Sequence, residues 1–156
     1  MSADMINDMY MMHNKFGVHD WFEKNKHDKD LMKKYLTFRL NMCLEELIET
    51  AQASDLELAI NDEGNFAFIG DVDKVDSEEV VDGLIDLCVF AIGTLDVFGV
   101  DTKVAWDQVY KANSIKTPGV KPGRPNPFGL PDLIKPEDWK APSHDGNHGS
   151  LPEIFK

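Results

Sequence analysis

Features that mark several classes of protein are scarce or missing in this sequence. Its 156 residues contain two cysteines and no C-x-x-C pair, which argues against a disulfide scaffold or a cysteine-based zinc site. The longest apolar stretch is interrupted by Asp82, Asp86 and Asp96, so it is too short for a membrane span. The first residues form neither a basic leader nor a cleavage signal. We therefore expect a cytoplasmic protein, with Cys43 and Cys88 as reduced residues of the core.

Basic residues are few, and prolines are absent from most of the chain. There are 16 Lys and Arg against 28 Asp and Glu, a net charge of -12, which argues against nucleic acid or a membrane surface as a partner. All eight prolines lie between Pro118 and Pro152. Residues 1–116 are therefore free to form long helices. Residues 117–156 are expected to form an extended Pro-rich arm on the same or a neighbouring subunit.

Hydrophobic periodicity predicts an all-α domain over residues 1–116. Helices are expected at residues 3–16, 30–53, 76–98 and 102–115. Residues 18–29 are expected to be a turn or loop. The segments 56–60 and 66–69 alternate around a turn at Gly64 and predict a small hairpin. The expected fold is like a four-helix bundle, with this hairpin as an insertion.

Three carboxylates lie within the most apolar of these helices. Nearly every residue from 80 to 98 is apolar, so this helix is expected to be buried almost all round. Glu79, Asp82 and Asp86 are spaced at i, i+3 and i+7 and therefore share one stripe of the helix. Ionised acids are rarely buried unless they are paired or bound to a metal. A cationic group is expected to face this stripe.

A second group of acids, Glu45, Glu46 and Glu49, lies in the helix expected at residues 30–53. Like charges at i, i+3 and i+4 cost an isolated helix roughly 0.2–0.5 kcal/mol per pair, and two acid stripes facing each other would repel strongly. A hard divalent cation held by carboxylate oxygens, above all Mg²⁺, relieves this repulsion.

The arrangement Glu45-Glu46-x-x-Glu49 followed by Glu79-x-x-Asp82 resembles the E-E-x-x-E … E-x-x-D signature of MazG-like all-α nucleoside triphosphate pyrophosphohydrolases. The likeness extends to the short single-domain members of bacteriophages. Those proteins share a first helix that ends like His13-x-x-Phe16-Gly17, an Asn-x-x-Lys like that at Asn113 and Lys116, and a Pro-rich ending like residues 126–131. The spacing between the two acid groups is slightly longer here, by about the expected hairpin.

The resemblance implies a fold, a reaction and a set of site residues. It implies Mg²⁺, replaceable by Mn²⁺, and cleavage of a nucleoside triphosphate between the α and β phosphates to give a monophosphate and pyrophosphate. A purine deoxynucleotide such as dGTP is one expected substrate, and a phage-encoded enzyme would act in the host cytoplasm. The implied metal ligands are Glu46, Glu49, Glu79 and Asp82. Glu45 is expected to act with Glu46 in catalysis, as a ligand or as a base that orients water.

Other residues have two interpretations each. Asp86 is either a further ligand or the partner of Lys111 or Lys116. The candidates for phosphate binding are Arg39, Lys111, Asn113 and Lys116, although lysines at a helix end also complement its dipole. Arg39 is alternatively the ion-pair partner of an acid. The candidates for base binding are His13 and Phe16, and Phe16 also suits the core.

Three alternatives to this function remain open from the sequence. A phosphoribosyl-ATP pyrophosphohydrolase is related in fold. A non-enzymatic helical interaction module would use the acids for solubility. A di-iron bundle needs histidines in its acid helices, and none of the five histidines lies there. For the enzyme we expect a homodimer or homotetramer, because the apolar third helix is hard to cover within one subunit. The arm would then cross onto a neighbour through Phe128, Leu133 and Trp139.

Overall fold

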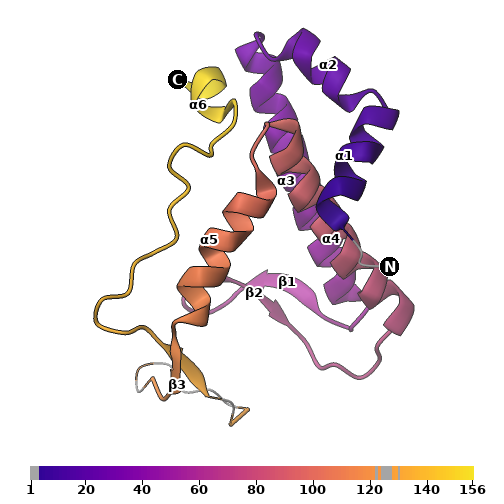
Figure 1. The fold of residues 1–156 in the computed structure, drawn as a ribbon. Coiled ribbons are helices and arrows are strands. Elements are labelled where there is room, and N and C mark those ends of the chain that lie inside the picture. The colour runs from indigo at the N-terminus through magenta and orange to yellow at the C-terminus, as the bar shows by residue number, and fades with distance from the viewer. Residues whose placement is uncertain (1–3, 122, 124–127, 130) are drawn as a thin grey trace.

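The computed structural model describes residues 4–121, 123, 128–129 and 131–156, and within them it is mostly helical, as predicted (Figure 1). The helices are α1 (Met5–Lys15), α2 (Val18–Asn25), α3 (Lys29–Gln52), α4 (Ser77–Val97), α5 (Thr102–Ser114) and α6 (Leu151–Phe155). The expected start of the first helix at residue 3, and residues 126, 127 and 130 of the Pro-rich ending, lie outside the described residues.

An aspartate begins each of the four longer helices α1, α3, α4 and α5. The side chains of Asp4, Asp28, Asp76 and Asp101 accept hydrogen bonds from the backbone N–H groups of the first turn. Such a cap contributes typically about 1 kcal/mol. The sequence therefore fixes where these helices begin through local chemistry, before any tertiary contact is made.

Helices α3 and α4 pack closely side by side and form the centre of the molecule (Figure 1). Two glycines of α4 allow this approach. A Cβ atom at Gly83 would lie 2.3 Å from Thr50 Oγ1, and a Cβ atom at Gly93 would lie 2.7 Å from Arg39 Nη2. Because the later residue of α3 meets the earlier glycine of α4, the two helices are antiparallel.

Helix α2 occupies part of the segment that was expected to be a turn or loop, so that prediction was wrong. Gly17 has a φ of 71° and redirects the chain, and Trp21 N–H donates to the carbonyl of Gly17 at 3.0 Å. An eight-residue helix is marginal on its own. This one is stabilised by Phe22, which is buried and packs edge-on against Phe98 with ring centroids 5.4 Å apart.

The main hydrophobic core lies at the end of the α3/α4 pair where α3 begins. It consists of Phe22, Met32, Val97, Phe98 and Ile154. Ile154 comes from α6, at the very end of the arm, and Ser150 N–H donates to the Phe98 carbonyl at 2.8 Å. The arm therefore returns to its own chain and completes its core (Figure 1).

Two short antiparallel strand pairs lie away from this core. Strand β1 (Glu57–Ile60) pairs with β2 (Phe66–Ile69), and Glu57 lies opposite Ile69. Strand β3 (Thr117–Gly119) pairs with β4 (Asp132–Ile134) within the arm. Beyond β4, the Trp139 indole N–H donates to the Ala112 carbonyl at 2.6 Å, so this predicted anchor also contacts its own chain.

Helix α4 is not buried all round in the single chain, which corrects the prediction. Val81 is 63% exposed and Ile85 is 52% exposed. Cys88 is also exposed rather than a core residue, and both cysteines are free. No single described helix has the length and hydropathy of a membrane span, and only α4 and α5 taken together across a 118° bend reach them.

Candidate active site

Four carboxylates from α3 and α4 act electrostatically on a fifth, Glu46. This residue is half-buried on α3. Partial burial raises the pKa of the Glu46 carboxyl, and the negative charges of Asp86, Glu49, Glu45 and Asp82 raise it further, in that order. We call these five residues the acid cluster. The structure thus brings the two predicted acid groups together across the α3/α4 contact.

The cluster lacks Glu79, one of the four predicted ligands, and includes Glu45 and Asp86, which were predicted as possible further ligands. Asp86 exerts the largest charge effect on Glu46, whereas Glu79 is absent from the charges that raise its pKa. Glu79 and Asp82 are exposed, and Asp86 is half-buried. The premise that all three α4 acids are buried was therefore wrong for the single chain. Proximity of like charges, and not burial in an apolar helix, is what marks the site.

No cationic side chain neutralises the acid cluster within the described part of the chain. The ion pairs there join Lys26 to Glu23, Lys33 to Asp30, and two histidines to Asp96. Asp86 pairs with neither Lys111 nor Lys116. The five carboxylates offer oxygen donors alone, which are the ligands that Mg²⁺ prefers. Among the described residues no three of them bring their ligand atoms within 4.8 Å of one another, so a bound cation would have to draw them closer.

The predicted phosphate-binding residues lie in two different places. Lys111 is exposed in the last turn of α5. Lys116 donates to Asn113 Oδ1 at 2.6 Å and lies 5.5 Å from the centroid of the Trp139 ring. All three residues lie at the end of α5, where no described contact joins them to the acid cluster.

Arg39 is buried between α3 and α4. Its Nε donates to Thr94 Oγ1 and its Nη2 donates to the Phe90 carbonyl, each at 3.0 Å, and its guanidinium lies over the Phe90 ring. Arg39 forms no ion pair with a carboxylate among the described residues. Of its two predicted roles, the ion pair with an acid is therefore not found in the single chain.

The predicted base-binding residues also separate. Phe16 is 67% exposed and so does not belong to the core. His13 is buried, and its Nδ1 lies 2.6 Å from Asp96 Oδ2, an oxygen that also lies 2.8 Å from His19 Nε2. Sequence reasoning missed this group, because Asp96 and its partners are 83 and 77 residues apart. An acid inside an apolar helix was the available signal.

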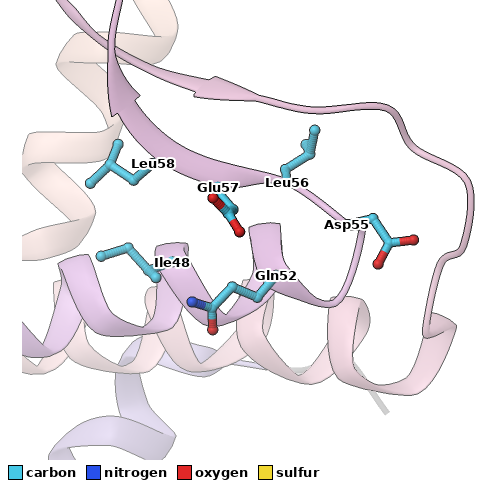
Figure 2. A pocket seen from close by; sticks show the side chains of 6 residues that line it. All are labelled: Ile48, Gln52, Asp55, Leu56, Glu57 and Leu58. Atoms are coloured by element: carbon cyan, nitrogen blue, oxygen red, sulfur yellow. The ribbon is translucent and has the colours of Figure 1, made fainter.

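A pocket of about 690 Å³ opens between α3 and β1, next to the acid cluster. Figure 2 shows the Glu57 side chain pointing from the strand toward α3, where Gln52 lies, with Ile48 and Leu58 together at one side. Ile48 follows Glu45 by three residues, as Gln52 follows Glu49, so the pocket and these acids occupy adjoining strips of α3.

A family model shows which protein family the chain belongs to. The family model described as Phosphoribosyl-ATP pyrophosphohydrolase matches residues 9–113, which is more than half of the chain and includes all five acids of the cluster. The chain belongs to the phosphoribosyl-ATP pyrophosphohydrolase family. The family activity is hydrolysis of a pyrophosphate bond in a nucleotide, typically with a divalent metal. No curated protein and no solved structure matches the chain significantly.

Proposed function

We propose that the chain hydrolyses a nucleoside or deoxynucleoside triphosphate between the α and β phosphates, with Mg²⁺ held by the acid cluster. The observation that carries this proposal is that acids of α3 and α4 converge in a segment that matches the pyrophosphohydrolase family: Asp86, Glu49, Glu45 and Asp82 all act electrostatically on Glu46. Glu79, which the family signature includes, completes the ligand set from the exposed N-terminal turn of α4.

The residues divide the chemistry between them. Bound Mg²⁺ would neutralise phosphate charge and polarise the attacked phosphorus. Glu46 and Glu45 would take the proton of the attacking water as its oxygen bonds to the α phosphorus, and the bond from that phosphorus to the bridging oxygen breaks to release pyrophosphate. Mn²⁺ is expected to substitute.

The rest of the substrate would be bound by residues outside the acid cluster. Lys111 and Lys116 are exposed or half-exposed cations that would meet phosphate oxygens. The pocket between α3 and β1 adjoins Glu45 and Glu49 and offers a surface for the nucleoside. We favour a purine deoxynucleotide such as dGTP. A second candidate is phosphoribosyl-ATP, because that substrate names the family whose model matches the chain.

A panel of four ribonucleotides, four deoxynucleotides and phosphoribosyl-ATP, each with Mg²⁺ or Mn²⁺, tests the proposal. Chromatography should show a monophosphate and pyrophosphate from at least one triphosphate, and EDTA should abolish both. Release of a diphosphate and orthophosphate would contradict the proposed cleavage position. Turnover of phosphoribosyl-ATP alone would select the second candidate.

We further propose that the enzyme is a homodimer or homotetramer. A single chain of 17.6 kDa exposes 11570 Å² of surface, whereas a folded monomer of that mass exposes about 7,900 Å². Large apolar side chains contribute to the excess: Phe38 on α3, Val81 and Ile85 on α4, and Trp106 and Tyr110 on α5 are each more than half exposed. A partner chain packed on these helices would cover them.

Light scattering of the intact chain tests this assembly. The expected mass is two or four times that of the chain at micromolar concentration. Val81→Glu places a charge in the exposed strip of α4 and should lower the mass, while Val120→Glu, at a still more exposed valine of the arm, should not. A monomer for the wild-type chain would contradict the proposal.

A further inference from the structure

Two histidines and an aspartate from three helices converge at the other end of the α3/α4 pair from the acid cluster. His13 Nδ1 and His19 Nε2 lie 2.6 Å and 2.8 Å from Asp96 Oδ2. The candidate ligand atoms of the three residues all lie within 4.8 Å of one another. His13 lies in the last turn of α1 and His19 in the first turn of α2, and the left-handed turn at Gly17 between them directs both rings to α4.

We propose that His13, His19 and Asp96 bind a divalent transition-metal ion, such as Zn²⁺, at a site separate from the acid cluster. Two imidazole nitrogens and one carboxylate oxygen suit Zn²⁺ and its first-row neighbours, whereas Mg²⁺ prefers oxygen donors alone. Asp96 follows Asp86 by ten residues of α4, about 15 Å along the helix. Donor chemistry and distance therefore both separate this ion from the catalytic one.

The surroundings hold the three ligands in place. The side chains of His13, Asp96 and His19 are 9%, 15% and 25% exposed, so solvent reaches the group from the His19 side. The His13 ring lies against Gly93, where a Cβ atom would come within 3.0 Å of its Cε1. The Tyr10 ring lies against His19 with centroids 5.0 Å apart. Such positioning reduces the ordering cost of binding a metal ion.

Binding changes the hydrogen bonds within the group but not its fold. The metal ion needs the lone pairs of His13 Nδ1 and His19 Nε2, so any proton on these atoms moves to the opposite ring nitrogen or to solvent. Asp96 Oδ2 then bonds to the ion in place of the two imidazoles. Arg39 carries a positive charge nearby, which repels the metal ion. Its guanidinium is held in place because it donates hydrogen bonds to Thr94 Oγ1 and to the Phe90 carbonyl.

Cobalt absorption tests the site without any measurement of turnover. The chelator-treated wild-type protein is titrated with Co²⁺ in excess Mg²⁺, which occupies the acid cluster. We expect visible d–d bands of a nitrogen-ligated, low-coordinate ion, at one equivalent per chain, and their loss when Zn²⁺ is added. Bands no different from those of Co²⁺ in buffer would show a structural hydrogen-bonded group only and would overturn the proposal.

Matched variants locate the ligands. His19→Gln, at the most exposed ligand, and Asp96→Asn should each weaken Co²⁺ binding by on the order of 100-fold, because loss of even an outer partner of a metal ligand costs about 10- to 100-fold. His27→Gln, at an exposed histidine outside the group, and Asp82→Asn, in the acid cluster, should keep the bands. Should Asp96→Asn not fold, His19→Gln decides alone. Wild-type binding in a folded His19→Gln variant would contradict the assignment.

Discussion

The two ends of the α3/α4 pair handle buried and clustered charge in opposite ways. At the acid cluster, five carboxylates stand together without a cationic partner in the described chain, and partial burial and these like charges raise the pKa of Glu46. At the other end, Asp96 is bonded to two histidines, and Arg39 is bonded to Thr94 and the Phe90 carbonyl. The carboxylates of the acid cluster lack a counter-charge, whereas the charged side chains at the other end have hydrogen-bond partners.

This difference separates function from stability on one pair of helices. A hydrogen-bonded group of opposite or neutral partners stabilises the fold, and its loss costs free energy of unfolding. A group of like charges costs free energy in the folded state and becomes favourable when a cation arrives. Substitutions at the two ends should therefore have effects of opposite sign on stability.

The largest expected effect is on catalysis at the acid cluster. Glu46→Gln should lower kcat by about 10²- to 10⁴-fold, because it removes a proton acceptor that contributes in that range. The free energy of unfolding without metal should hold or rise, since one like charge is removed. Steady-state kinetics and chemical denaturation measure the two quantities.

Glu78→Gln is the control, because Glu78 is an exposed acid of α4 whose charge does not raise the pKa of Glu46. It should leave both quantities near their wild-type values. Unfolding of Glu46→Gln with metal binding retained would mean that Glu46 is a structural residue.

The second-largest effect is expected on stability, in the hydrophobic core at the Asp96 end of the α3/α4 pair. Ile154→Ala should lower the free energy of unfolding by about 2–5 kcal/mol, the usual cost of truncating a buried aliphatic side chain. Ile154 is 8% exposed within the cluster of Phe22, Met32, Val97 and Phe98. Urea denaturation provides the measurement, with Leu133→Ala in the exposed part of the arm as the control. Equal costs for the two variants would mean that α6 does not complete the core.

A smaller loss is expected at Asp96. Asp96→Ala leaves two histidines without their shared acceptor and should cost about 1–3 kcal/mol of stability. Asp86→Ala, at the acid-cluster end of the same helix, should cost nothing or stabilise the protein. Parallel denaturation curves without metal compare them. A larger loss at Asp86 than at Asp96 would reverse the comparison drawn above.

The smallest effect is a pH dependence. The folded-state pKa of Glu46 is raised above its ordinary 4.5, so the folded protein binds more protons than the unfolded chain. The contribution of Glu46 to stability is thus complete below the unfolded pKa and is lost as the pH rises through the raised value. As the pH rises from about 4.5, the melting temperature without metal should therefore fall less for Glu46→Gln than for the wild type. A steeper loss in the variant would contradict the sign of the shift.

Local signals in the sequence predicted the helices well. The helices expected from residues 30, 76 and 102 begin at Lys29, Ser77 and Thr102, because Asp28, Asp76 and Asp101 cap them through local contacts that need no distant partner. The spacing of the α3 and α4 acids predicted a shared metal site, which stays a prediction; the structure places Asp86, Glu49, Glu45 and Asp82 where their charges act on Glu46.

Features that depend on distant partners escaped prediction. Helix α2 forms because Phe22 packs on Phe98, and α6 forms where Ile154 enters the same core, contacts that no local pattern reveals. The His13 and His19 contacts with Asp96 join residues more than 70 positions apart. The exposure of α4 was misjudged for a related reason: an apolar helix is buried only where the chain supplies a cover.

The Mg²⁺ dependence of pyrophosphate release tests the central claim most directly. The preferred nucleotide is assayed over a range of Mg²⁺ concentrations with the wild type, Asp86→Asn and Asp96→Asn. If the acid cluster holds the catalytic cation, Asp86→Asn will need a much higher Mg²⁺ concentration for half-maximal release, or will show none, while the half-maximal concentration for Asp96→Asn stays at the wild-type value. A shifted Mg²⁺ requirement in Asp96→Asn together with an unchanged one in Asp86→Asn would contradict the account.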